Sequence, residues 1–138
     1  MLKINLGNVL FLGSILFIIS LTLFPEAALG IGVGKGGINV TPFHTIGHTL
    51  FHHTFANFIK NNIGNIILFM PFGFLLPFKF RSINSILKAC LVGMLFSATI
   101  ECVQLFMSSR WTDVDDVILN TIGTGIGYNV FKIYVRED

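Results

Sequence analysis

The sequence predicts an all-α membrane protein: a polytopic bundle of about four transmembrane helices with both termini in the cytoplasm. Three observations lead to this fold class: the composition, the length of the apolar runs, and the distribution of lysine and arginine. Only 12% of the 138 residues are charged and 53% are hydrophobic, whereas soluble domains have roughly 25% charged and 45–50% apolar residues. No shift in composition divides the chain, so we expect a single domain over residues 1–138.

Four apolar runs are candidate membrane-spanning helices, at residues 6–24, 63–78, 86–107 and 114–135. The first has no charged residue and is close to the roughly 20 residues needed to cross the hydrocarbon. It is longer than the apolar part of a signal peptide and lacks a small-residue cleavage site, so we expect it to be retained. Pro71 and Gly73 interrupt the second run, which membrane helices tolerate when neighbours satisfy the backbone. Gly123 and Gly127 form a small-xxx-small pair that permits close helix packing.

The lysine and arginine residues predict the orientation. With four spans, six of them lie on the side of the two termini and three on the other side. Because cytoplasmic loops carry the excess of positive residues, we predict cytoplasmic termini, with the first and third loops outside. The net charge of +2 is too small and too scattered to indicate nucleic acid as a partner.

A carboxylate inside a predicted span draws attention to the outer end of the bundle. Glu101 and Gln104 are three residues apart and share one face of the helix 86–107. A membrane carboxylate costs several kcal/mol by most estimates, so Glu101 requires a reason. In one interpretation Arg110 pairs with Glu101 or an aspartate and the network locks the bundle. In the other, a pocket opens outward and Arg110 is ready for a carboxylate or phosphate; intramembrane charge favours this second interpretation.

The start of the helix 114–135 adds polar residues at the same end. Thr112 or Asp113 can cap this helix, and Asp115 and Asp116 can lie against the positive end of its dipole. Asn120 follows Asp116 by four residues and so lies on the same face. The predicted binding-pocket residues are Asn65, Glu101, Gln104, Arg110, Asp113, Asp115, Asp116 and Asn120.

Three blocks of the sequence carry a family resemblance. Residues 65–77 read NIILFMPFGFLLP, residues 39–43 read NVTPF, and residues 113–123 read DVDDVILNTIG, after Glu101, Gln104 and Arg110. Taken together they resemble the VanZ-like family of bacterial integral membrane proteins, over residues 39–128. The resemblance implies a multi-pass protein of the bacterial cytoplasmic membrane, associated with resistance to the glycopeptide antibiotic teicoplanin. It also places the polar motif of the family on the eight pocket residues.

Three functions are compatible with these patterns. The first is a cell-envelope accessory protein whose outward pocket recognises a lipid-linked component, such as a cell-wall precursor, or a lipoglycopeptide. The second is a small membrane enzyme that modifies an envelope lipid with Glu101 as acid or base, although the sequence offers no convincing nucleophile. The third is a structural or partner-binding module with Gly123 and Gly127 at a helix interface. We expect no cofactor, and an oligomer is compatible with so small a unit.

A histidine pattern in the first loop raises the question of a metal. His44, His48 and His52 recur every four residues, so on a helix they would line one face, and imidazoles at this spacing can bind zinc. The outer two are about 12 Å apart by helical rise, too far to share one ion easily. An interfacial helix with its histidines toward water is the simpler interpretation. The glycines between Gly30 and Gly37 lack the context of a nucleotide loop and predict a flexible segment.

Overall fold

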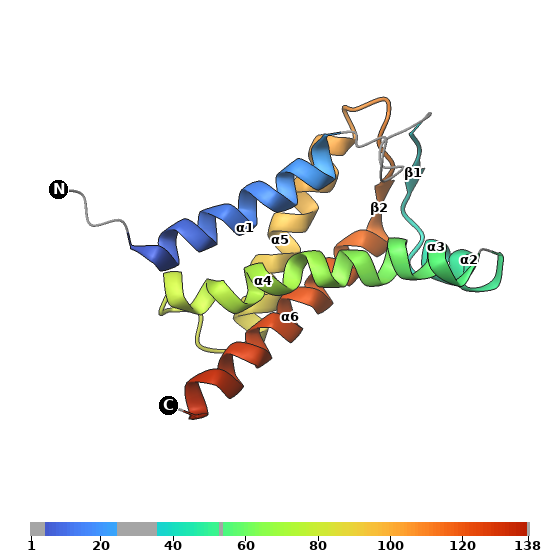
Figure 1. The fold of residues 1–138 in the computed structure, drawn as a ribbon. Helices are drawn as coiled ribbons and strands as arrows, with labels where there is room; N and C mark the ends of the chain where they lie inside the picture. The colour runs from blue at the N-terminus through green and yellow to red at the C-terminus, as the bar shows by residue number, and fades with distance from the viewer. Residues whose placement is uncertain (1–4, 25–35, 53, 138) are drawn as a thin grey trace.

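The computed structural model describes residues 5–24, 36–52 and 54–137 (Figure 1). These residues form a helical bundle, which confirms the predicted fold class. Its elements are α1 (Leu6–Leu23), β1 (Ile38–Asn39), α2 (His44–His52), α3 (Phe55–Phe58), the π-helical turn η2 (Ile59–Ile63), α4 (Gly64–Lys79), α5 (Ile86–Gln104), β2 (Thr112–Asp113) and α6 (Val114–Glu137). Of the glycine-rich segment, only Gly36 and Gly37 lie inside the described residues.

Three helices in the described part of the chain are long and apolar enough to cross a membrane: Leu6–Leu23, Phe55–Lys79 and Ile86–Gln104. The second begins before the predicted residue 63, because η2 joins α3 to α4 without a break. α6 has 24 residues, about 36 Å at 1.5 Å per residue. It is not one of these three helices because its polar residues make it less apolar than they are. A fourth span over α6 and the cytoplasmic location of the termini stay predictions.

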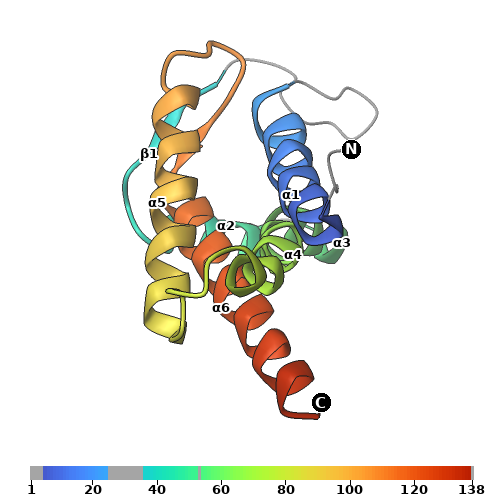
Figure 2. The ribbon, with the colours of Figure 1, turned by 90° about the vertical axis from the view of Figure 1, so that its left-hand side faces the viewer.

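α6 packs against both α4 and α5, while α1 lies beside α4 (Figure 2). Glycines set the distance between α4 and α6. A methyl group added at Gly123 would collide with the carbonyl oxygen of Ile66, and one at Gly127 with that of Met70. The small-xxx-small pair therefore does permit close packing, and the helix that it contacts belongs to the same chain.

Aromatic side chains fill the space between α1, α4 and α5. The ring centroids of Phe11 and Phe72 are 5.6 Å apart, and those of Phe72 and Phe96 are 5.1 Å apart. Phe69 is fully buried and contacts the rings of Phe72 and Phe96. The outer surface of α1 carries exposed leucines such as Leu12 and is suited to lipid. This apolar core holds the helix ends in fixed positions.

The two ends of the bundle differ (Figure 1). The start of α1 and the end of α6 lie at one end, and β1, β2 and α2 lie at the other. There β1 pairs in parallel with β2, with Ile38 opposite Thr112. Next to the strands, the Gly36 N–H donates to the Ser108 carbonyl at 2.9 Å and the Thr112 N–H to the Gly37 carbonyl at 2.9 Å. We call this end the polar end: the last turn of α1, residues 36–52, the first turn of α4, and residues 101–116.

Candidate functional site

Asp113 connects the third loop, α5 and α6. Its Oδ1 accepts the N–H of Asp115 at 2.9 Å, so Asp113 rather than Thr112 caps α6. The same oxygen accepts Nδ2 of Asn39 at 2.9 Å, next to the paired strands. The Asp113 N–H donates to Oε2 of Glu101 at 2.8 Å. Glu101 is buried, and this contact gives its carboxylate a structural role in fixing the start of α6.

Asp115 holds the first loop in place. Its side chain is fully buried, and its carboxylate accepts three backbone N–H groups: from Phe43 at 2.5 Å, Thr45 at 2.9 Å and Ile46 at 3.1 Å. Because the first amides of a helix have no partner within it, Asp115 caps α2 from another element. Phe43 has a φ of 62°, an unusual conformation for a bulky residue. No sequence pattern links Asp115 to a loop some seventy positions away.

Arg110 binds the end of α1. Its Nη2 donates to the Leu21 carbonyl at 2.9 Å and also to the Thr22 carbonyl. Nε2 of Gln104 donates to that same Thr22 carbonyl at 2.8 Å. A cation is favourable here because the last carbonyls of a helix lack partners and carry the negative end of its dipole. Burial lowers the pKa of Arg110, and nearby carboxylates oppose that shift. The guanidinium thus contacts backbone carbonyls where the network interpretation expected a carboxylate.

Two further side-chain hydrogen bonds join helices inside the bundle. Nδ2 of Asn65 donates to Oδ1 of Asp116 at 2.6 Å and connects α4 to α6. Nδ2 of Asn120 donates to the Ser97 hydroxyl at 2.8 Å and connects α6 to α5. Oδ1 of Asn120 is buried and has no hydrogen-bond partner among the described residues. Asn65, Asp116 and Asn120 therefore hold helices together from within the bundle.

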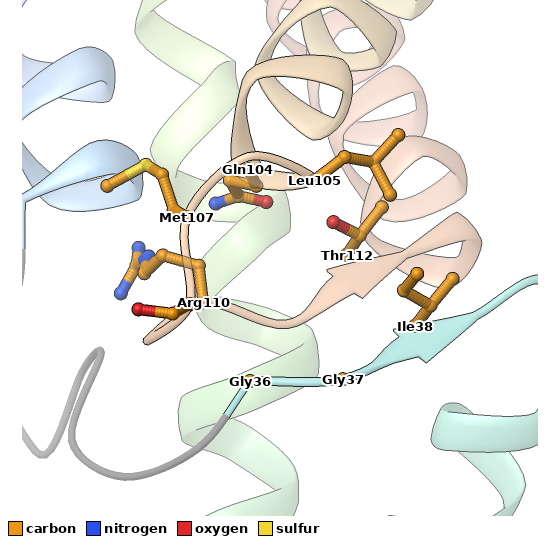
Figure 3. A pocket seen from close by; sticks show the side chains of 9 residues that line it. Gly36, Gly37, Ile38, Gln104, Leu105, Met107, Arg110 and Thr112 are labelled. Atoms are coloured by element: carbon orange, nitrogen blue, oxygen red, sulfur yellow. The ribbon is translucent and has the colours of Figure 1, made fainter.

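A cavity of about 250 Å³ lies between the paired loops and the end of α5 (Figure 3). Of the eight predicted pocket residues, two line it, Gln104 and Arg110. The other six belong to the hydrogen-bonded framework around it. The remaining lining residues are Gly36, Gly37, Ile38, Leu105, Met107, Ser108 and Thr112. These seven are not among the predicted pocket residues, because they come together only through the pairing of two loops distant in the sequence.

The histidine row lies on α2, as its spacing predicts. The ring centroids of His44 and His48 are 6.2 Å apart, and those of His48 and His52 are 4.9 Å apart. All three side chains are exposed. Within residues 5–24, 36–52 and 54–137, no group of three or more His, Cys, Asp or Glu side chains is placed to hold a metal ion.

The helices and the polar framework define the class of protein: a membrane protein with its polar residues gathered at one end of an apolar bundle. The VanZ/LLP1 family model matches residues 11–135, and the chain belongs to this family. Protein VanZ of Enterococcus faecium is 32% identical over 96 residues, which are 70% of this chain and 53% of that protein. The chain thus spans about half the length of this curated relative. No solved structure shows a significant match.

Proposed function

We propose that this protein is a cell-envelope accessory protein of the bacterial cytoplasmic membrane that protects against teicoplanin. In this proposal the polar end recognises a lipid-linked envelope component or a lipoglycopeptide. Family membership and the similarity to Protein VanZ support the link to the envelope and to resistance. The observation that carries the proposal is the cavity lined by Gln104 and Arg110 at the end of an apolar bundle.

An amphiphile suits this arrangement because polar and apolar surfaces meet at the cavity. Ile38 and Leu105 line it and expose 66% and 49% of their surface. Gln104 and Arg110 are nearly buried and bring an amide and a guanidinium to the same wall. A ligand whose tail stays in the lipid can therefore place its polar head among hydrogen-bonding groups that the protein holds in position.

The two alternative functions have less support. A membrane enzyme would use Glu101 as acid or base, yet this carboxylate already accepts the Asp113 amide, a structural contact. A partner-binding module would offer Gly123 and Gly127 to another protein. Both glycines contact the α4 backbone of the same chain, so that face is already covered.

Inhibitory concentrations in a susceptible Gram-positive host test the proposal. Wild type, Glu101→Gln and Arg110→Lys are expressed at matched membrane abundance, and teicoplanin is compared with vancomycin. Glu101→Gln keeps an oxygen for the Asp113 amide and removes the charge. Arg110→Lys keeps the charge and removes the planar guanidinium, whose Nη2 donates to both carbonyls. Arg81→Lys is the matched control, because Arg81 lies exposed in the turn after α4.

The expected result is protection that is selective for teicoplanin, kept by Arg81→Lys and lost by the two variants at the polar end. Equal protection by all four proteins would place the function elsewhere in the molecule. If wild type gives no protection, the resistance function is wrong for this member of the family, and its ligand is then sought among other envelope lipids.

A further inference from the structure

Gln104 presents an unsatisfied acceptor at the cavity. It is the last residue of α5, lines the cavity and is 5% exposed. Its Nε2 donates to the Thr22 carbonyl, while its Oε1 is buried with no hydrogen-bond partner among the described residues. Turning the amide over would set this oxygen against the Thr22 carbonyl, and two acceptors cannot bond. The contact with α1 therefore fixes the orientation of the Gln104 amide, with the acceptor oxygen turned away from α1 (Figure 3).

The guanidinium of Arg110, which lines the cavity, directs one of its nitrogens toward α1. Nη2 of Arg110 is engaged with the carbonyls of Leu21 and Thr22. Figure 3 shows the guanidinium of Arg110 and the amide nitrogen of Gln104 on the side of α1, with the amide oxygen on the opposite side. The buried side-chain atom without a partner at this wall is thus an acceptor, Oε1 of Gln104, and an acceptor requires a ligand that donates, such as a hydroxyl.

The size of the cavity limits which part of a ligand can enter it. The volume of the cavity is about 250 Å³. It lies below the roughly 300 Å³ at which pockets for drug-sized ligands begin. A whole glycopeptide antibiotic does not fit inside, whereas a single headgroup unit does.

We propose that this cavity binds the neutral, hydroxyl-bearing headgroup of a membrane lipid, about the size of one sugar ring, through a hydroxyl that donates to Oε1 of Gln104. This inference rests on the proposed function and selects the lipid over the lipoglycopeptide as the ligand of the cavity. The terminal torsion of a glutamine amide is broad, so a small rotation brings the oxygen to the ligand while Nε2 stays near the Thr22 carbonyl. The lipid tail lies outside the cavity, beside Ile38 and Leu105.

Trp111 supplies a direct readout of binding. It is the single tryptophan of the chain, and its ring lies so close to Gly37 that a methyl group there would collide with it. Because Gly37 lines the cavity, a bound headgroup changes the surroundings of the indole. The purified full chain is kept in lauryldimethylamine oxide, a detergent without hydroxyl groups. It is titrated with monoglucosyl-diacylglycerol, and with phosphatidylcholine and phosphatidic acid of the same chains as comparison lipids.

The expected result is saturable binding of the glucosyl lipid, at least about tenfold tighter than that of either comparison lipid. Gln104→Met keeps the length of the side chain, removes the acceptor and weakens binding about tenfold, as expected for one lost hydrogen bond. Ser108→Phe is a second cavity variant, which tests the inference if Gln104→Met fails to fold. Ser108 is exposed and lines the cavity, so a phenyl ring there should block binding without disturbing the core. Ser109→Phe is its control, because Ser109 does not line the cavity.

Three results overturn the inference: no saturable binding of the glucosyl lipid, tighter binding of phosphatidic acid, or unchanged binding after both cavity variants. Its failure is distinct from failure of the proposed function, because inhibitory concentrations are measured separately. Protection without glucosyl-lipid binding rejects the ligand and keeps the function. Binding without protection rejects the function and keeps the ligand.

Discussion

The contact between α4 and α6 provides the sharpest test of the packing. In Gly127→Ala the new methyl group would collide with the Met70 carbonyl oxygen and lie 2.8 Å from the Phe74 nitrogen. Both are backbone atoms, so no side-chain rotation relieves the clash and the two helices must separate. Overpacking of this kind destabilises a protein by about 1–3 kcal/mol. Replacing a glycine within a helix by alanine stabilises it by roughly 0.5–1 kcal/mol, which offsets part of this cost. We expect a net loss of about 0–2.5 kcal/mol in the free energy of unfolding relative to wild type.

Gly13→Ala is the matched control, because no atom would lie within 4 Å of a methyl group at this position in α1. It is expected to leave the free energy of unfolding unchanged or to raise it by up to about 1 kcal/mol. Unfolding is measured by far-ultraviolet circular dichroism in mixed micelles of increasing dodecyl sulfate content. If Gly127→Ala is as stable as Gly13→Ala, the close approach of α4 and α6 is refuted.

Three further predictions concern the polar framework. Asp115→Ala leaves three partly buried amides at the start of α2 without an acceptor, and the cost for each is at most about 1–3 kcal/mol, the value for a fully buried group. Hydrogen exchange should then accelerate in residues 36–52 and stay slow in α5; equal protection in the variant would contradict the cap. A double-mutant cycle of Asn65→Ala and Asp116→Ala should give a coupling of about 0.5–1.5 kcal/mol, as for a typical intramolecular hydrogen bond, and additive effects would argue against it. Ser97→Ala should lower the free energy of unfolding by about 1 kcal/mol, because it leaves Nδ2 of Asn120 unpaired. Adding Asn120→Leu should restore most of that loss. A larger loss in the double variant would show that Ser97 and Asn120 do not form an independent pair.

Local sequence features were sufficient for the helices and for the end at which the polar residues gather. Long apolar runs specify helices because a backbone in lipid must satisfy its own hydrogen bonds. The spacing of Gly123 and Gly127 predicted a close helix contact for a similar local reason. The residue that precedes a helix is also informative, since the candidate cap Asp113 does accept the N–H of Asp115 in the first turn of α6.

The partners of the charged side chains could not be predicted in the same way. One interpretation paired Arg110 with a carboxylate of the same chain and the other left it ready for a ligand, whereas in the structure it donates to carbonyls at the end of α1. Asp115 does lie in the first turn of its own helix, as predicted, but its hydrogen bonds to the start of α2, some seventy positions away in the sequence, were not predicted. A charged side chain can hydrogen-bond to any nearby backbone N–H or carbonyl group of opposite polarity. The spacing of residues in the sequence does not indicate which backbone group will be near.

The sequence by itself determined the membrane class, the family, the helices and the polar end, because each depends on composition, local spacing or a motif. The tertiary structure alone decided which polar residues line a cavity and which hold the framework. That division arises from the parallel pairing of β1 with β2, which brings Gly36 and Gly37 beside the end of α5. Such pairing joins backbone groups more than seventy residues apart, and backbone hydrogen bonds leave almost no trace in side-chain identity.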